Sequence, residues 1–202
     1  CLLSRGLGDV YKRQYYWYET LLPKSVCEEI CNILKQSDTE LKEAEVVGQE
    51  ASHVRKSVNH WVPDSSWING FCRHYIDLAN DKNFKYDIYS GFDNGKIQYS
   101  LYKPGYFYHW HTDSFFENDN CRKLSFSVQL SNYDEYKGGD LQFVDDEGEL
   151  YVAPKTQGTI IIFDSRLRHR VKKVTEGERR SLVGWVMGCL LYTSPSPRDK
   201  RQ

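Results

Sequence analysis

The 202-residue sequence predicts a mainly β protein, a jelly roll (double-stranded β-helix) with helices flanking its N-terminal side. After residue 84 the hydrophobic pattern changes from helical spacing to short alternating or β-branched runs. Turn-forming Gly, Pro, Asn and Asp separate these runs. Roughly eight strands with no helix between them favour an antiparallel sandwich or barrel, and a jelly roll has about that many.

We expect one domain over residues 15–189, with helical support over 15–83 and the jelly-roll core over 84–189. Residues 1–14 and 190–202 lack helical or strand periodicity, and both end in Lys-Arg-Gln. They resemble translated sequencing-adaptor sequence, so we expect artefactual or disordered tails outside the fold.

Charge and hydropathy narrow the class of partner. The whole chain has a net charge of −1, but without the tails it has 21 basic and 26 acidic residues, a net of −5. An acidic body argues against non-specific binding to nucleic acid or to an anionic membrane. No apolar run approaches the roughly 20 residues that span a bilayer. The six cysteines form no C-x-x-C pair, which favours reduced thiols in a cytoplasmic protein.

Two helices are predicted before residue 84. The first begins at Ser25, because Ser25-Val26-Cys27-Glu28 has the form of a capping box. Its apolar stripe consists of Val26, Ile30, Ile33 and Leu34, with Cys27 and Cys31 as small buried hydrophobes. The second begins near Asp64-Ser65-Ser66, and its inward-facing residues are Ile68, Phe71, Cys72, Tyr75, Ile76 and Ala79. Residues 46–63, between the helices, are interpreted as a long loop or a weak hairpin.

Strands are predicted at eight places in the core. These are residues 84–89, 96–102, 123–130, 140–144, 149–152, 158–163, 170–174 and 181–187. Among the turns between them are Lys137-Gly138-Gly139 and Thr175-Glu176-Gly177.

The most informative segment contains His111 and Asp113. Residues two apart in a strand point to the same side, so this imidazole and carboxylate can reach one point. Together they supply two of the three ligands of the 2-His-1-carboxylate triad that suits Fe(II). Such a triplet alone is a weak signal, because many occur by chance.

A third ligand and an anion site follow further along the chain. His169 opens a strand directly after the buried run 158–163, and distant strands of a sandwich can face each other across the core. Ten residues later come Arg179 and, on the same strand face, Ser181. A guanidinium beside a hydroxyl makes a forked site for a carboxylate. The metal would then hold one end of a dicarboxylate, and this pair the other.

Five elements in a fixed order resemble a known family. They are Tyr102, His111-x-Asp113, Gly138-Gly139-Asp140-Leu141, His169-x-Val171 and Gly177-x-Arg179-x-Ser181-Leu-x-x-Trp185. This order is similar to that of the prolyl 4-hydroxylase-like family of iron(II)/2-oxoglutarate dioxygenases. The resemblance covers about residues 97–188, and a looser one extends back to Tyr15.

The resemblance implies a site and a reaction. His111, Asp113 and His169 would ligate Fe(II) and form the catalytic centre, while Gly138-Gly139-Asp140 would be a structural turn. Arg179 would pair with the distal carboxylate of 2-oxoglutarate, helped by Ser181 and the hydroxyl of Tyr102. Molecular oxygen would be the second co-substrate, with L-ascorbic acid as a further cofactor. The implied reaction hydroxylates an aliphatic C–H, favouring a peptidyl residue such as proline, while 2-oxoglutarate is decarboxylated to succinate.

Some residues leave alternatives open. Where some relatives have an aromatic hydroxyl on the central strand, this chain offers Ser127 and Gln129, so their contact with the co-substrate is open. His109 shares a strand face with His111 and competes with it as a ligand. Ordinary surface or capping roles are expected of the remaining histidines, His53, His60 and His74.

Arg55 and Trp61 lie in the segment interpreted as a loop, which is either a solvated basic turn or a lid over the substrate. The substrate itself also stays open, because a fold does not fix function. A free amino acid, a small metabolite or, least favoured, a methylated base are alternatives to a peptide. A non-catalytic jelly-roll binding module is the alternative from another class.

Overall fold

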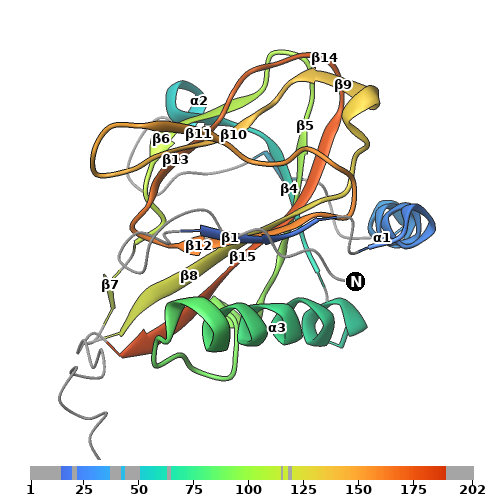
Figure 1. Cartoon of the computed structure of the whole chain (residues 1–202). Coiled ribbons are helices and arrows are strands. Elements are labelled where there is room, and N and C mark those ends of the chain that lie inside the picture. The colour runs from blue at the N-terminus through green and yellow to red at the C-terminus, as the bar shows by residue number, and fades with distance from the viewer. Residues whose placement is uncertain are drawn as a thin grey trace, which may run out of the picture.

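The computed structural model describes residues 15–19, 22–36, 42–43, 51–62, 65–114, 116–117 and 120–189 (Figure 1). The two predicted tails lie outside these residues. Two antiparallel sheets form stacked layers, which confirms the predicted double-stranded β-helix. The larger sheet has the order β1-β12-β8-β15-β5-β4-β2 with β7 added on β8, and the smaller has the order β11-β10-β13-β6-β3.

The strands of the larger sheet are β1 (Tyr15–Tyr18), β2 (Lys42–Glu43), β4 (Val58–Trp61), β5 (Gln98–Tyr102), β7 (Phe116–Glu117), β8 (Asn120–Gln129), β12 (Ile160–Asp164) and β15 (Arg179–Cys189). Those of the smaller sheet are β3 (Arg55–Lys56), β6 (Phe107–His111), β10 (Leu141–Val144), β11 (Leu150–Val152) and β13 (Arg168–Val171). A separate pair consists of β9 (Tyr136–Gly138) and β14 (Val174–Gly177). Short helical turns are α2 (Ala51–Val54), η1 (Asn80–Phe84), η2 (Asp93–Gly95) and η3 (Tyr133–Glu135).

The larger sheet is buried on both faces, and β12 shows how. Ile160 and Ile162 belong to the core beneath the helices, whereas Ile161 and Phe163 belong to the core between the two sheets. Successive strand residues point to opposite faces, so a strand covered on both sides is apolar throughout. This explains the unbroken apolar run of β12. The core between the sheets is the layer that surrounds the candidate site.

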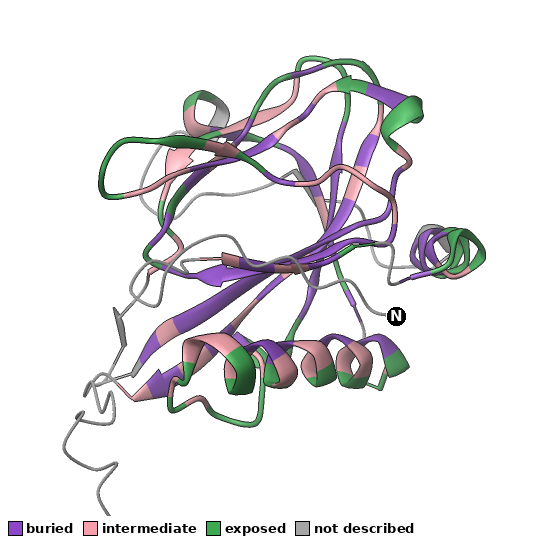
Figure 2. Cartoon of the chain, in the orientation of Figure 1, coloured by how far each residue is buried: buried purple, intermediate pink, exposed green. Residues whose placement is uncertain are grey.

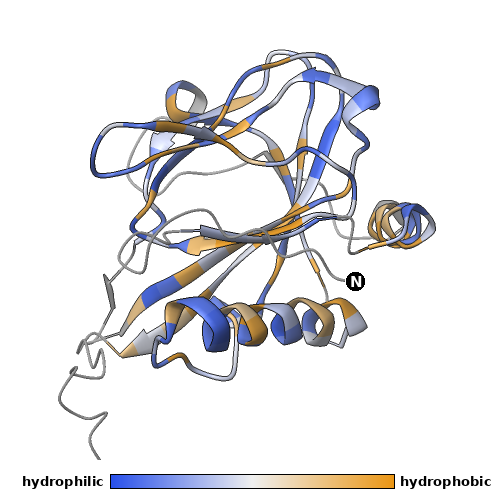
Figure 3. Cartoon of the chain, viewed as in Figure 1, coloured by the Kyte–Doolittle hydropathy of each residue, from blue (hydrophilic) through white to orange (hydrophobic). Residues whose placement is uncertain are grey.

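The first helix, α1 (Lys24–Gln36), packs beside the larger sheet. Its side toward the sheet is buried and hydrophobic, and its outer side is exposed and polar (Figures 2 and 3). The buried positions are Cys27, Ile30, Cys31 and Leu34. Ile33 lies off this face and is 41% exposed, so its predicted inward placement is wrong. The predicted capping box is also wrong, because the helix begins at Lys24 and Ser25 lies inside it.

The second helix, α3 (Trp67–Ala79), lies across the face of the larger sheet that points away from the smaller one (Figure 1). Ser66 caps it by accepting a hydrogen bond from the backbone N–H of Ile68, which confirms the predicted start. All of the predicted inward residues are buried or packed against the helical core. Among the described residues, no helix is long and apolar enough to cross a membrane.

One predicted strand, over residues 84–89, is absent. The π-helical turn η1 extends α3 instead, and Lys85 ends it in a left-handed conformation, with φ of 58°. The side chain of Asn80 then bonds both backbone groups of Tyr86, at 2.9 Å each, so this backbone needs no strand partner. Phe84, Tyr86 and Ile88 pack against the helical core, which explains their alternating pattern without a strand.

The segment expected to be helical support contributes strands as well. It contains β1 to β4, and β4 pairs with both β5 and β2. His60 was expected at the surface, but it is 2% exposed because the two-residue period of β4 places it on the same buried face as Val58. The part of residues 46–63 that the structure describes is therefore ordered in strands and one short helix.

Near the end of the chain, one predicted strand is divided in two. Residues 170–171 belong to β13 and residue 174 begins β14, with 172–173 between the two strands. The predicted turn Thr175-Glu176-Gly177 is part of β14, which pairs with β9. Of the predicted turn Lys137-Gly138-Gly139, the first two residues belong to β9 and Gly139 follows it, while both glycines have positive φ. A Cβ atom on Gly138 would approach the carbonyl oxygen of Lys173 to 2.2 Å, so only glycine fits there.

Asp164, at the end of β12, anchors the segment after α3. Its buried carboxylate accepts hydrogen bonds from the hydroxyl of Tyr86 and from the backbone and guanidinium of Arg166. Burial raises the pKa of Asp164, but these bonds outweigh it, and the net effect is a pKa below its usual range. We expect Asp164→Asn to lower the free energy of unfolding by about 1–3 kcal/mol, because the buried carboxylate that accepts all of these hydrogen bonds is replaced by a neutral amide. Urea denaturation at pH 7 measures this.

The pH dependence supplies a second test of the same network. Because the folded pKa lies below the unfolded value of about 4, the stabilisation is complete above pH ~4 and is lost as pH falls further. Asp164→Asn should remove this part of the acid sensitivity. Asp81→Asn, which removes an exposed partner of Lys85, is the control and should change stability by less than about 0.5 kcal/mol. Equal effects of the two variants would contradict the assignment.

Candidate metal centre

Strands β6 and β13 bring two histidines together. They are neighbours in the smaller sheet, and His111 lies directly opposite His169 in their register. The imidazole centroids are 4.1 Å apart. The expectation that the two stretches face each other across the core is therefore wrong. They pair side by side because the chain returns to the same sheet after crossing the larger one through β12.

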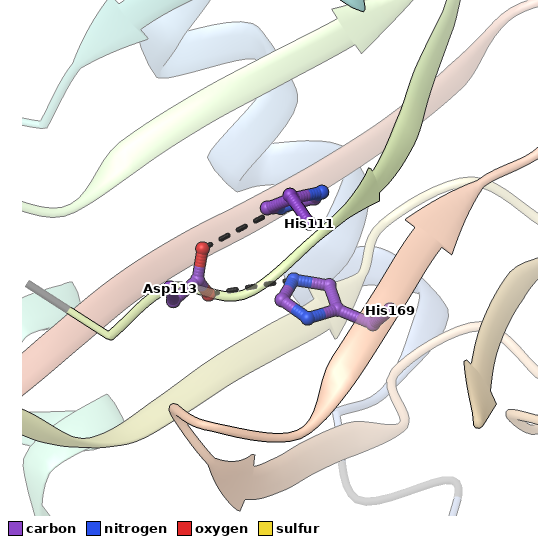
Figure 4. A group of neighbouring side chains, drawn as sticks. All are labelled: His111, Asp113 and His169. Carbon is purple, nitrogen blue, oxygen red and sulfur yellow. Dashed lines mark ion pairs between the residues drawn. The ribbon is translucent and has the colours of Figure 1, made fainter. Parts of the chain in front are cut away.

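Asp113 completes a cluster of three side chains (Figure 4). It lies beyond the end of β6, so the predicted strand does not extend to it. Its backbone N–H instead donates to the carbonyl of Ser165 at 2.9 Å, and this fixes the loop. The carboxylate faces both rings from one side, with Oδ1 at 3.5 Å from Nε2 of His111 and Oδ2 at 3.4 Å from Nε2 of His169. All ligand atoms lie within 4.8 Å of one another.

The outer ring nitrogens are held by backbone carbonyls. Nδ1 of His111 lies 2.7 Å from the carbonyl of His109, and Nδ1 of His169 lies 2.9 Å from that of Leu167. A carbonyl oxygen only accepts, so these partners assign the ring proton to Nδ1 in each neutral imidazole. The lone pair of Nε2 then points into the cluster, as a metal ligand requires.

The protonation states also suit a metal. Burial by itself raises the pKa of Asp113, but its interactions with His169 and His111 outweigh this effect, and a hydrogen bond from Trp185 adds to them. The pKa of Asp113 therefore lies well below its usual range. Burial lowers the pKa of His169 to about 4. A carboxylate at Asp113 and a neutral imidazole at His169 are thus present at neutral pH, and these are the forms that bind a divalent metal.

Trp185 positions the carboxylate from the opposite sheet. It lies on β15, and its indole N–H donates to Asp113. Its ring is itself covered by the guanidinium of Arg122, 4.1 Å from the ring centroid, and Arg122 forms an ion pair with Asp93. The sequence placed Trp185 in a family pattern without assigning it a role. A tryptophan at an alternating position with Arg179 and Ser181 is the signal that could have found it.

The cluster opens into a pocket between the two sheets. Both sheets contribute to its wall. The lining residues are Arg55, Tyr102, Tyr108, His111, Asp113, Phe126, Ser127, Leu141, Phe163, His169, Val171, Arg179, Val183 and Trp185.

Arg179 provides a buried positive charge in this pocket. It is 1% exposed, and no acidic side chain among the described residues pairs with it. Nη1 donates to the hydroxyl of Ser181 and Nη2 to the amide oxygen of Gln129, both at 3.1 Å, while Nε has no partner among the described groups. Tyr102 pairs with Arg179 across β5 and β15, and its ring centroid is 5.5 Å from the guanidinium carbon. A buried charge without a counter-ion is costly, so the geometry suits an anionic ligand.

The structure distinguishes Ser127 from Gln129. The buried hydroxyl of Ser127 lines the pocket and has no partner among the described groups, so it is available to a ligand. Gln129 does not line the pocket, and its amide oxygen supports Arg179. The two residues pair with Val183 and Ser181 on β15. The sequence left open whether Ser127 or Gln129 contacts the co-substrate, and of the two only Ser127 lines the pocket.

The other predicted candidates do not converge on the cluster. His109, His53 and His74 are exposed, and His109 does not line the pocket. Trp61 is 47% exposed at the end of β4 and also does not line it. Arg55 does line it, from β3 in the smaller sheet.

Comparison with known proteins identifies the family. Residues 97–187, which contain the cluster and Arg179, match the model of the 2OG-Fe(II) oxygenase superfamily. The chain belongs to this superfamily. Its curated relatives include PKHD-type hydroxylases from Parvibaculum lavamentivorans, 37% identical over 45% of this chain and 41% of the relative, and from Synechococcus sp., 38% identical over 67% and 55%. The chain thus spans about half the length of the relatives it matches.

Solved structures show the same fold. A Pseudomonas putida prolyl-4-hydroxylase superposes with a TM-score of 0.67 at 22% identity, over 86% of this chain and 91% of that chain. A Trichoplax adhaerens prolyl hydroxylase, solved with a hypoxia inducible factor peptide fragment, superposes with a TM-score of 0.72 at 17% identity, over 89% and 86%. At these identities the likeness establishes the double-stranded β-helix of this chain.

A direct test of the cluster is to remove one ligand. We expect His169→Ala to weaken Fe(II) binding by more than the roughly 10–100-fold lost when only a supporting residue is removed. Anaerobic Fe(II) titration against a competing chelator measures this. His109→Ala is the matched control, because that side chain is exposed on the same sheet while its backbone carbonyl is retained. Unchanged affinity in His169→Ala would exclude this histidine as a ligand.

The support from β15 is tested separately. Trp185→Phe keeps an aromatic ring but removes the N–H that donates to Asp113. We expect Fe(II) affinity to fall about 10–100-fold, since supporting hydrogen bonds fix ligand orientation. Trp67→Phe, at an exposed tryptophan of α3, should leave it unchanged. If both variants bind Fe(II) like the wild type, Trp185 has no positioning role.

Proposed function

We propose that this protein is an Fe(II)- and 2-oxoglutarate-dependent dioxygenase that hydroxylates an aliphatic C–H of a peptidyl residue, with proline the first candidate. The observation that carries the proposal is the meeting of three metal-ligating side chains with an uncompensated buried guanidinium in one pocket. The prolyl hydroxylases among the fold relatives make proline the first residue to test.

The residues present fit both groups that the family name implies. His111, Asp113 and His169 would hold Fe(II), because imidazole nitrogens and a carboxylate leave it redox-active with open positions, whereas thiolates favour zinc or clusters. Arg179 would bind the distal carboxylate of 2-oxoglutarate, with the free hydroxyl of Ser127 as a second donor and Tyr102 forming the wall. Ser181 and Gln129 would fix the guanidinium.

The division of labour follows from these positions. Bound Fe(II), 2-oxoglutarate and O2 supply the oxidising chemistry, and the protein supplies orientation and a closed environment. The dicarboxylate would be held between the metal-ligating cluster and Arg179 on β15. Its length would therefore have to match the distance between these two groups. Apolar side chains from both sheets, including Leu141, Phe163 and Val171, exclude water from this layer.

Other expectations enter the proposal with it. We propose residues 15–189 as the oxygenase domain, acting in the cytoplasm on a peptide or small molecule and not on nucleic acid. Ascorbate stays a prediction, and omission from the assay tests it. A free amino acid or small metabolite is the second candidate substrate, favoured by a further cationic side chain in the pocket, Arg55. A non-catalytic binding module would not account for the ligand cluster.

The decisive experiment measures succinate release from 2-oxoglutarate, with and without Fe(II), against proline-containing peptides and free amino acids. We expect iron-dependent succinate and a product heavier by one oxygen atom. His169→Ala should abolish both, whereas His109→Ala should retain them. Succinate formation by His169→Ala at the wild-type rate would overturn the ligand assignment, and the absence of iron-dependent turnover would overturn the proposed reaction.

Arg179→Gln tests the co-substrate site. We expect the KM for 2-oxoglutarate to rise about 10–100-fold, because hydrogen bonds to charged groups contribute about 1.5–3 kcal/mol. Fe(II) binding in the absence of 2-oxoglutarate should remain near the wild-type value, since Arg179 is not among the metal-ligating residues. Arg170→Gln, at a half-buried arginine of β13 that does not line the pocket, is the control. An unchanged KM in Arg179→Gln would place the carboxylate elsewhere.

A further inference from the structure

A second buried arginine, Arg55, lines the same pocket as the metal-ligating cluster. It is 9% exposed, and among the described residues no carboxylate pairs with it. The sequence placed it in a loop, as a solvated turn or a lid. In the structure it lies on β3 and pairs with Tyr108 of β6, the strand that ends at His111.

The guanidinium of Arg55 is held rigidly on one side. Nε donates to the hydroxyl of Ser57 at 2.9 Å, and Nη2 donates to the amide oxygen of Asn59 at 3.2 Å. The hydroxyl of Ser57 donates in turn to the same oxygen of Asn59, which closes a small network of neutral groups. The guanidinium carbon lies 4.7 Å from the ring centroid of Tyr108, and that ring stacks on His111 at 3.5 Å. None of these partners neutralises the charge, and Nη1 donates to no described group.

The charges around the pocket indicate what is missing. Its ionised lining groups are Asp113, Arg55 and Arg179. Fe(II) adds two positive charges and 2-oxoglutarate two negative ones, so the loaded pocket would keep one excess positive charge. An excess buried charge is unfavourable unless an anion neutralises it. Because the distal carboxylate of 2-oxoglutarate is assigned to Arg179, the excess charge belongs to Arg55.

We propose that Arg55 is the substrate-binding residue of this pocket and that it recognises a carboxylate of the substrate. This inference rests on the proposed function and narrows its substrate class to acids. A guanidinium fixed by Ser57 and Asn59 offers Nη1 and the second proton of Nη2 to a carboxylate. The carboxylate is either the α-carboxylate of a free amino acid or the side chain of an Asp or Glu near the target residue of a peptide.

The experiment compares acids with their amides. The probes are L-proline with L-prolinamide, and a short proline peptide with Glu or Gln beside the proline. Binding to the anaerobic protein loaded with Fe(II) and 2-oxoglutarate is measured by calorimetry, and succinate release is measured in air. In at least one pair, the wild type should bind the acid about 10–100-fold more tightly than the amide. The free pair and the peptide pair distinguish the two sources of the carboxylate.

Three variants test whether the preference for the acid over its amide depends on Arg55. Arg55→Gln should abolish it while leaving the affinity for 2-oxoglutarate unchanged, in contrast to Arg179→Gln. Arg55→Lys keeps the charge without the rigid fork and should retain a reduced preference, which gives a result even if Arg55→Gln does not fold. Lys56→Gln, which removes an exposed charge next along β3, is the matched control and should behave like the wild type.

Two results would overturn the inference. The first is that the preference for acid over amide does not depend on Arg55. Either the wild type binds acid and amide equally in both pairs, or Arg55→Gln or Arg55→Lys keeps the full wild-type preference. The other is a loss of 2-oxoglutarate affinity in Arg55→Gln as large as that in Arg179→Gln, which would assign Arg55 to the co-substrate. A third result would count against the proposed reaction alone. In it, no iron-dependent succinate is formed, but the protein still binds the acid more tightly than the amide and Arg55→Gln removes this preference.

Discussion

The pairing of β6 with β13 is the interaction on which the site depends. It places His111 opposite His169, and a register shift between His169 and Val171 brings Tyr108 into the same neighbourhood. A shift of one residue would turn one of the imidazoles to the other face of the sheet. The flanking pairs of β13 with β10 and of β6 with β3 fix this register from both sides. The metal site therefore follows from the strand order of the smaller sheet.

The larger sheet makes a different contribution. Its central strands, β8 and β15, are the longest described and are covered on both faces. From the inner face, Trp185 reaches Asp113, and Arg179 and Ser127 also line the pocket. The smaller sheet thus holds the two histidines and, in the loop after β6, Asp113, whereas the larger sheet orients that carboxylate and contributes the buried guanidinium of Arg179. Neither sheet alone would form the pocket.

Buried charge links the two sheets to chemistry. Two arginines lie within the protein without an acidic partner among the described residues, although buried cations in proteins are normally paired. Each is held by neutral oxygens, Ser181 and Gln129 in one case and Ser57 and Asn59 in the other. Such an arrangement fixes geometry without satisfying the charge. It is the expected form of a site that is complete only when an anionic ligand is bound.

Much of this could be predicted from local pattern. The turn residues and the two-residue period gave the β core, and the spacing of α3 gave its buried face, because these features depend on neighbours in the sequence. The same period failed at residues 84–89, where aromatic side chains pack against the helices and Asn80 satisfies the backbone. It failed again at β3 and β4, short strands whose formation depends on pairing with β6 and β5.

The sequence by itself determined the main candidates for the site, since His111, Asp113, His169 and Arg179 were identified from residue type and order, and all four line one pocket. Only the tertiary structure decided that the histidines are neighbours in one sheet, that Trp185 holds the carboxylate and that Arg55 is buried in the pocket. The reason is physical. Chemistry is a property of a side chain, but burial and partners depend on which distant strands pair.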